Sequence, residues 1–299
     1  MSAGVQKLKS RIKSAKNIAQ ITKAMEMVSA AKMRKAQERA LLSKPYAEAI
    51  SQMLGMVGAR MRGDVSAHPL LQVQGKPENA LVILMTSNKG LAGSFHAGLF
   101  RKLSSLEKQL FEKDLGVSYV AYGKKGRDFL RYTKRNIAAV FDNLGDHPTT
   151  RELRPMVQFL TNEFTSGRVA EVYLVYAEFV STLVQKPTAQ KLLPFAMQAH
   201  SQDLEEKENE ILTQVPIFEP NKEQLLNMLL PFAVEFLVYK AVVQNLASEH
   251  SARMMAMKNA HDNAKEIGAD LLLAYNQIRQ ATITAQINEI AGATMASYS

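Results

Sequence analysis

The sequence predicts an α+α/β fold, in which a long antiparallel coiled coil of N- and C-terminal helices carries an inserted small α/β domain with a mostly parallel sheet. First, residues 5–44 contain neither glycine nor proline, as one uninterrupted helix requires. Second, residues 232–296 contain no proline and only two glycines, Gly268 and Gly292. Third, apolar runs of strand length alternate with amphipathic segments between these ends, which is typical of α/β domains.

The C-terminal segment needs a partner along its length. As one helix it would extend roughly 95 Å, and a helix of that length is not stabilised by propensity alone. Its lower part offers a seam, because apolar residues there repeat with heptad spacing. The predicted seam consists of Ile267, Leu271, Ala274, Ile278, Ala281 and Ala285.

The N-terminal helix is the natural partner. Its first apolar residues, Val5, Leu8, Ile12 and Ala15, follow heptad spacing. The pattern then restarts one residue early, which predicts a stammer that overwinds the coil locally. Because one domain is inserted between the two helices, they are expected to pair antiparallel. The restarted pattern consists of Ile18, Ile21, Met25 and Val28.

The chain is expected to divide into five segments: a first coil helix at 1–62, a linker at 63–79, the α/β domain at 80–196, an acidic loop or foot at 197–220 and the second coil helix at 221–299. Pro45 is expected to kink the first helix, and Pro231 to kink or restart the second. In the α/β domain, strands are predicted at 80–86, 117–122, 137–141, 169–179 and, at an edge, 191–195, with helices at 95–113, after Gly123 and at 150–165.

Composition excludes several classes of protein. The 299 residues are 46% hydrophobic and 22% charged, so the chain is neither disordered nor membrane-embedded. The absence of cysteine excludes disulfides, thiolate zinc sites and cysteine nucleophiles. No signal peptide or transmembrane run is expected, and the predicted setting is cytosolic or cytosol-facing.

The positive charge is concentrated in residues 1–44, where eleven Lys and Arg face two Glu. That segment alone accounts for the net charge of +9 of the whole chain. A basic helix fits nucleic acid, anionic lipid or an acidic protein surface. The alternative is a solvated helix face.

Two glycine-containing loops, at 87–95 and 123–126, each follow a predicted strand and precede a helix. Neither has the third glycine of a dinucleotide fingerprint or the Gly-Lys-Ser/Thr of a phosphate cradle, so both are interpreted as structural turns. The six histidines have no metal-ligand spacing, and no Ser, His and acid set lies within one predicted site. No catalytic residue, cofactor or metal is therefore predicted.

The C-terminal tip differs from the rest of its helix. Between residues 280 and 299 the only charged side chain is Glu289. A helix that is small and apolar on nearly all sides is expected to be surrounded, but Thr, Gln and Asn interrupt it too often for a lipid bilayer. We therefore expect a protein sleeve around the tip, with a frayed tail as the alternative.

Both ends of the chain resemble one family. Residues 21–35 (ITKAMEMVSAAKMRK) are similar to the N-terminal helix of the gamma subunit of F-type ATP synthase. Residues 248–260 (SEHSARMMAMKNA) and 275–284 (YNQIRQATIT) resemble its C-terminal helix, and residues 87–95 resemble its loop after the first strand. The chain departs from the family pattern at Gln286, where an acidic residue is usual, and in a closing spacing one residue shorter.

The resemblance implies a central rotor shaft, present in one copy per complex, that transmits torque from an ion-driven c ring to an alpha/beta ring whose beta subunits catalyse ATP synthesis. It implies alpha, beta, epsilon and c-ring partners, no nucleic acid, no direct membrane insertion, and a peripheral place on the cytoplasmic face of a bacterial inner membrane. The implied contacts with the alpha/beta ring are Lys7, Lys9, Arg11, Lys23, Met25, Lys32, Arg34, Lys35, Arg279, Gln280, Ile283, Ile287 and Ile290. The implied contacts with the c ring and epsilon are Glu210, Phe218 and Glu219.

Two other functions are compatible with parts of the sequence. The basic first helix suggests a nucleic-acid-binding coiled coil, which predicts salt-sensitive DNA binding, although that helix lacks aromatic residues for base stacking. The glycine loops suggest a small-molecule enzyme, which predicts nucleotide affinity of the isolated protein.

Overall fold

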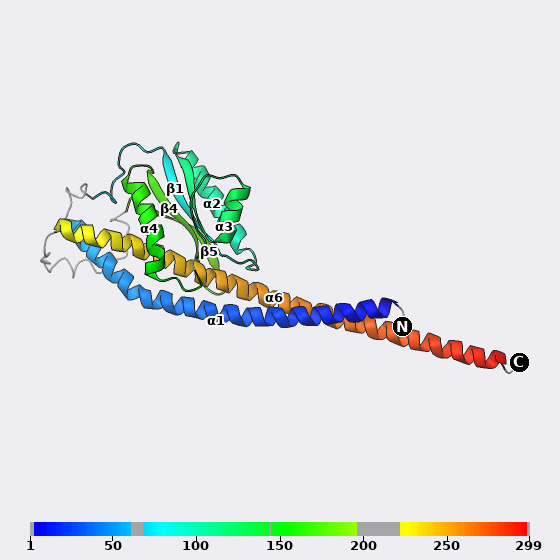
Figure 1. Cartoon of the computed structure of the whole chain (residues 1–299). Helices are drawn as coiled ribbons and strands as arrows, with labels where there is room; N and C mark the ends of the chain where they lie inside the picture. Colours follow the sequence, from blue (N-terminus) through cyan, green and yellow to red (C-terminus); the bar gives the residue numbers. More distant parts are fainter. Residues whose placement is uncertain (1–2, 61–67, 144, 196–221, 298–299) are drawn as a thin grey trace. The chain divides into compact units, whose positions relative to one another are not determined.

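The computed structural model describes residues 3–60, 68–143, 145–195 and 222–297 (Figure 1). The chain divides into two compact units, which we describe separately. The helical unit contains Met1–Ser29 and Arg253–Ser299, and the sheet unit contains Ala30–Ala252.

The terminal helices contribute to both units. Helix α1 spans Ala3–Arg60 and helix α6 spans Lys222–Ser297. Pro45 lies inside α1 and Pro231 inside α6, so neither proline ends its helix. The restart of the second helix that was considered at Pro231 does not occur.

The other elements confirm the predicted alternation of strand and helix. They are β1 (Asn79–Met85), α2 (Phe95–Phe111), β2 (Gly116–Tyr122), α3 (Lys124–Tyr132), β3 (Ile137–Phe141), α4 (Thr150–Thr165), β4 (Glu171–Phe179) and β5 (Gln185–Leu193). The prediction for the last strand was too short, because it placed the start at 191. Strand β5 begins six residues earlier and contains Pro187, which an edge strand tolerates.

The five strands form one sheet in the order β3-β2-β1-β4-β5. The pairs β1/β2, β1/β4 and β2/β3 are parallel, and only β4/β5 is antiparallel. The order reverses direction between β1 and β4, as in doubly wound folds, where the carboxyl ends of the strands form a crevice that commonly holds a ligand. The mostly parallel sheet predicted from the sequence is confirmed.

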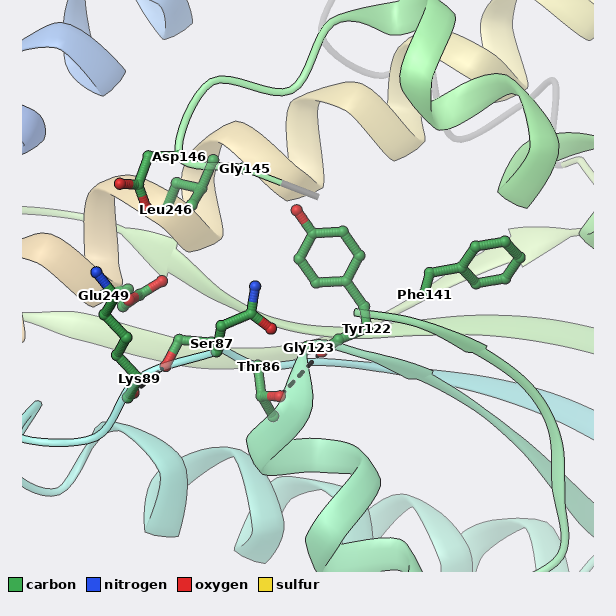
Figure 2. Close-up of a pocket in the computed structure, with 11 residues that line it drawn as sticks. Thr86, Ser87, Lys89, Tyr122, Gly123, Phe141, Gly145, Asp146, Leu246 and Glu249 are labelled. Carbon is green, nitrogen blue, oxygen red and sulfur yellow. Dashed lines mark hydrogen bonds between the residues drawn. The ribbon is translucent and has the colours of Figure 1, made fainter. Parts of the chain in front are cut away.

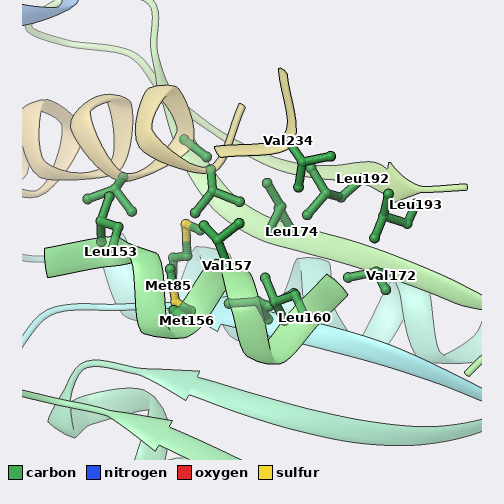
Figure 3. Packing of buried hydrophobic residues seen from close by; sticks show 14 of the residues in the cluster. Met85, Leu153, Met156, Val157, Leu160, Val172, Leu174, Leu192, Leu193 and Val234 are labelled. Atoms are coloured by element: carbon green, nitrogen blue, oxygen red, sulfur yellow. The ribbon is translucent and has the colours of Figure 1, made fainter. Parts of the chain in front are cut away.

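Each face of the sheet is covered by helices, which explains the nearly continuous apolar run of β1. Helices α2 and α3 cover one face through Leu99, Leu103 and Leu130. Helices α4 and α6 cover the other. Figure 3 shows Met156 and Leu160 of α4 packed against the sheet in the same cluster as side chains of α6.

Helix α6 contains the one stretch, among the described residues, that is long and apolar enough to cross a membrane by length and composition. More than half of that 18-residue window is buried within the protein. Leu230, Val234 and Val238 of α6 belong to the core cluster of the sheet unit. The apolar character of this stretch is thus accounted for by packing against the sheet.

Candidate partner-binding surfaces

In the helical unit, α1 and α6 pair antiparallel, as predicted. The imidazole Nδ1 of His261 lies 2.7 Å from the carbonyl oxygen of Ala19. Further along, a Cβ placed on Gly268 would lie 3.8 Å from the Cβ of Ala15. From the first contact to the second, the residue number increases along α6 and decreases along α1, so the two helices run in opposite directions.

The buried side of α1 follows one unbroken heptad pattern, so the predicted stammer is wrong. Ala15, Ala19 and Thr22 are buried, and they continue the spacing set by Val5, Leu8 and Ile12. The larger residues Ile18, Ile21 and Val28 are exposed, whereas Met25 is half-buried. Sequence periodicity followed the largest side chains, but small residues allow the partner helix to approach more closely and therefore form the seam.

The seam observed on α6 also lies at smaller residues than the predicted one, for the same reason. Ile267 is 55% exposed and Ile278 is 41% exposed, whereas Ala264 is buried and Gly268 is half-buried. Ala281 and Ala285 are also exposed, and Leu271 and Ala274 are half-buried. A signal that would have found this seam is the heptad spacing of Met257, His261, Ala264, Gly268 and Leu271.

Both helices of this unit therefore carry apolar residues that the described chain leaves uncovered. On α1, Ile21 is 60% exposed, and on α6, Leu273 is 62% exposed. A groove of about 550 Å³ lies between the helices, with Ile12, Met27 and Leu272 among its lining residues. Exposed apolar residues beside an apolar groove are typical of a protein–protein contact.

The predicted basic contacts near the N-terminus lie at the surface. Lys7, Lys9 and Arg11 are exposed. Lys23 is also exposed and forms an ion pair of 3.1 Å with Glu26 one turn later. Their charges are thus accessible to an acidic partner.

Lys32, Arg34 and Lys35 belong to the sheet unit. Arg34 and Lys35 are exposed. Lys32 is half-buried and forms an ion pair with Asp146, in the loop that follows β3. Burial raises the pKa of the Asp146 carboxyl, but the hydrogen bond and the charge of Lys32 outweigh burial and hold that pKa below its ordinary value. Lys32 therefore has an internal role that the sequence did not indicate.

The predicted contacts of the tip are all exposed: Arg279, Gln280, Ile283, Ile287 and Ile290. Ile287 is 59% exposed and Ile290 is 67% exposed. The predicted contacts Glu210, Phe218 and Glu219 lie outside the described residues.

The sheet unit contains a cavity of about 230 Å³ at the carboxyl ends of β1, β2 and β3. Figure 2 shows Ser87, Lys89 and Tyr122 around it, together with Leu246 and Glu249 of α6. Burial, followed by the charges of Glu249, Asp146 and Glu152, raises the pKa of the Tyr122 hydroxyl above its ordinary value.

The two glycine loops at this crevice are joined by hydrogen bonds, so the backbone N–H groups at the start of α3 already have acceptors within the protein. The first three backbone N–H groups of α3 donate to the first loop and the residue before it: Lys124 to Asn88 Oδ1 at 3.0 Å, Lys125 to the Ser87 carbonyl at 3.1 Å and Gly126 to Thr86 Oγ1 at 2.7 Å. A phosphate at a helix N-terminus uses these same donors. Protein acceptors take them here, which supports the interpretation of both loops as structural turns.

Side chains of α6 also form hydrogen bonds with the backbone of β4, beyond the point where its neighbour β1 ends. Strand β1 pairs with β4 only as far as Val175. Beyond it, the N–H of Ala177 donates to Asn245 Oδ1 at 3.0 Å, and Ser248 Oγ donates to the carbonyl of Ala177 at 2.9 Å. The N–H of Phe179 donates to Gln244 Oε1 at 3.0 Å. We call these three α6 residues the polar clamp; the sequence analysis missed them.

The clamp places α6 across the crevice in which doubly wound proteins commonly hold a ligand. The two helices of the helical unit leave apolar residues uncovered and have exposed basic residues beside them. These features are typical of a subunit that belongs to a larger assembly.

Comparison with known proteins agrees with that class. The sequence profile of the ATP synthase family matches residues 4–296. The ATP synthase gamma chain of Roseiflexus castenholzii is 43% identical over 291 residues, which cover 97% of each chain. That of Herpetosiphon aurantiacus is 41% identical over 299 residues and 98% of each chain. The chain belongs to the family of ATP synthase gamma chains.

Solved structures show the same fold. The rotor of Euglena gracilis mitochondrial ATP synthase in rotational state 1 matches with a TM-score of 0.62 at 18% identity, covering 95% of this chain and 100% of that one. A chain of the central stalk and c ring of Tetrahymena thermophila mitochondrial ATP synthase matches with a TM-score of 0.60 at 24% identity, covering 80% and 99%.

Proposed function

We propose that this chain is the central rotating subunit of an F-type ATP synthase, transmitting torque from an ion-driven c ring to a ring of alpha and beta subunits. It is present in one copy per complex and contacts the epsilon subunit as well. The chain itself is peripheral to the membrane, on the cytoplasmic face of a bacterial inner membrane. Catalysis of ATP formation belongs to the beta subunits.

The observation that carries this proposal is the uncovered apolar surface of the helical unit. Ile21 and Ile267 are each more than half exposed although the opposite sides of their helices are packed, and Ile287 is more than half exposed on the tip. A surrounding ring of partner subunits would bury these residues. As the subunit turns, different partners would meet the same side chains, so each orientation favours a different partner conformation through its contacts.

The basic residues have a complementary role. Exposed ion pairs contribute about 0–1 kcal/mol each, so Lys7, Lys9 and Arg11 steer and push acidic loops of the partners rather than bind them tightly. Arg279 and Gln280 contact a loop of beta, and Lys23 and Met25 lie near the coupling contact.

The tip behaves differently because it lacks charge. Ile283, Ile287 and Ile290 would turn within an apolar collar, where a charged side chain would be desolvated at every angle. The foot at Glu210, Phe218 and Glu219 would meet the c ring and epsilon.

The test is to assemble the full chain with alpha, beta, epsilon and membrane subunits and to measure ion-driven ATP synthesis. Arg279→Ala is expected to lower coupled synthesis several-fold. Because Lys32 also pairs with Asp146 inside the sheet unit, the cleaner charge reversal is Arg34→Glu with Lys35→Glu, which leaves that pair intact. It too is expected to lower coupled synthesis.

A matched control is the double reversal Arg151→Glu with Arg154→Glu, two exposed arginines on α4. It introduces the same change of charge away from the terminal helices and is expected to leave synthesis unchanged. If the Arg279 and Arg34/Lys35 variants synthesised ATP at the unaltered rate, the assigned contacts would be wrong. If no copy of the chain entered the alpha/beta ring, the proposed function itself would be wrong.

A further inference from the structure

The loop between β4 and β5 exposes three large apolar side chains within five residues. Val180 is 59% exposed, Leu183 is 74% exposed and Val184 is 53% exposed. Turns are usually built from Gly, Pro, Asn, Asp and Ser, and Ser181 is the only one of these in the loop. Single apolar residues scattered over a surface need no explanation, but a cluster such as this one is typical of a contact with another protein. We call residues 180–184 the hairpin loop.

The hairpin loop has a defined shape, because its own backbone closes it. The carbonyl of Val184 accepts from the N–H of Val180 at 3.2 Å and from that of Ser181 at 3.0 Å. In the other direction, the N–H of Val184 donates to Ser181 Oγ at 3.1 Å. Both valines are β-branched and have few rotamers, so their side chains are largely pre-organised. An apolar surface that is already ordered loses little conformational entropy when a partner covers it.

The hairpin loop is also anchored to α6. Ser251 Oγ donates to the carbonyl of Thr182 at 2.7 Å, and Gln185 Nε2 donates to the same oxygen at 3.0 Å. At the end of β4, Gln244 of the polar clamp accepts from the N–H of Phe179 at 3.0 Å. The polar groups of the loop thus attach it to the rest of the sheet unit, while its apolar side chains remain exposed.

We propose that the hairpin loop is a docking surface for the alpha/beta ring. This inference rests on the proposed function, in which the ring encloses the helical unit. Ser251, which anchors the loop, lies on α6 two residues before Arg253, where the α6 part of the helical unit begins. A ring subunit that contacts the first turn of this part of α6 is therefore within reach of the hairpin loop as well.

The composition of the hairpin defines the kind of pocket that it fits. Its apolar side chains require an apolar centre, because a polar group facing them would be desolvated without a hydrogen-bond partner. Glu178 and Lys186 are exposed and lie opposite each other at the base of the hairpin. They supply the polar rim that protein–protein interfaces have around an apolar core. The partner surface is thus an apolar depression edged by polar groups.

The test compares two variants that carry the same substitutions. Val180→Ser with Val184→Ser removes apolar surface from the hairpin loop, and Val73→Ser with Val140→Ser removes it at two exposed valines elsewhere in the sheet unit. Full-length chains are titrated into purified alpha and beta subunits, and native gel electrophoresis measures the chain concentration at half-assembly. The loop variant should require a concentration at least about fivefold higher than the parent, because it removes apolar area from the contact. The control should assemble like the parent.

Urea unfolding of the chain alone separates docking from folding, and the loop variant should unfold at the same urea concentration as the parent. Leu183→Lys is a second, independent variant at the most exposed of the three positions. Its charge remains hydrated in the free chain but would be desolvated in an apolar pocket, so it should also raise the half-assembly concentration at least about fivefold. If the double variant unfolded more easily than the parent, the assembly of Leu183→Lys would decide the outcome.

Half-assembly of the loop variants at the parental concentration would overturn the proposal, and so would an equal loss in the Val73/Val140 control. Weaker binding to epsilon or to the c ring, with ring assembly unchanged, would identify a different partner and would overturn it too. In all of these results the parent still enters the ring, so the proposed function would stand. A parent chain that did not enter the ring would overturn both.

Discussion

Gly123 lies where the first turn of α3 meets the end of β1. Its φ of 86° and ψ of 152° fall in a region that is almost restricted to glycine. A Cβ there would also lie 2.7 Å from the backbone oxygen of Thr86, which cannot move aside without disturbing β1. The sequence showed a glycine loop at this place, but the tertiary contact that requires glycine is visible only in the fold.

Gly123→Ala is therefore expected to lower the free energy of unfolding by about 3 kcal/mol or more, from backbone strain and overlap together. Gly75→Ala is the matched control. Gly75 also has a positive φ, of 73°, but nothing lies within 4 Å of its Cβ position. That variant should lose about 1 kcal/mol, from strain alone. Urea unfolding of both variants measures the difference, and equal losses would contradict the overlap with Thr86.

Asp146 gives a second prediction, for the dependence of stability on pH. Its pKa in the folded protein is held below the ordinary value of 3.8 by Lys32, with a smaller contribution from His250. The ionised carboxylate thus stabilises the fold above about pH 4, and the gain is lost as the pH falls through the lowered pKa. Because the side chain is 41% exposed, solvent screening limits the gain to about 1 kcal/mol or less.

Asp146→Asn should consequently unfold more easily than the parent at pH 7, and the difference should shrink toward zero as the pH falls below 4. Unfolding in urea at a series of pH values measures this. A difference that persisted unchanged at pH 2 would mean that the carboxylate charge is not its source.

Among the elements, the two terminal helices show what sequence periodicity can and cannot predict. The existence of α1 and α6 follows from their long stretches without helix-breaking residues, and their antiparallel pairing follows from the domain inserted between them. The seam was misplaced on both because Ile18, Ile21 and Ile267 are the stronger apolar signals, and yet they are exposed. Large apolar residues are left exposed here, and a single sequence does not distinguish them from core residues.

The polar clamp leads to a prediction for α6. Asn245 is fully buried, and its Oδ1 accepts from the Ala177 N–H, while its Nδ2 has no hydrogen-bond partner among the described residues. Asn245→Leu would leave the Ala177 N–H buried without an acceptor, at a cost of about 1–3 kcal/mol.

Asn263→Leu is the control, because Asn263 is an exposed asparagine on the same helix. It is expected to change the free energy of unfolding by less than about 0.5 kcal/mol. Thermal unfolding of the two variants compares them, and similar melting temperatures would show that the clamp does not stabilise the sheet unit.

For the whole molecule, the α/β alternation, the mostly parallel sheet and the family could all be predicted from the sequence. The strand order could not, because local patterns carry no information on which strands are neighbours. Nor could the position of α6 over the crevice, since Gln244, Asn245 and Ser248 look in sequence like ordinary polar positions of a helix. The cavity beside them takes Thr86, Tyr122 and Glu249 from distant parts of the chain.

The uncovered apolar surface gives a prediction at this scale. Ile21→Ser with Ile267→Ser should change the free energy of unfolding of the chain alone by about 0.5 kcal/mol or less, because both side chains are exposed. The same variant should bind its assembled partners at least tenfold more weakly, since it removes apolar area from the contact.

Ala264→Asn provides the opposite case, because Ala264 is buried in the seam. It is expected to destabilise the chain itself. Unfolding curves and binding titrations of both variants compare these effects. A large loss of chain stability in the Ile21/Ile267 variant would mean that the surface is internal after all.

The polar clamp has a consequence for synthesis on the ribosome. Strand β4 is complete at Phe179, but the side chains that satisfy its last backbone groups arrive only with residues 244–248. Leu230, Val234 and Val238 cover one side of the sheet and are also translated late. The sheet unit therefore cannot finish folding until about four-fifths of the polypeptide has been translated. Until then its strands are synthesised, but one face of the sheet remains uncovered.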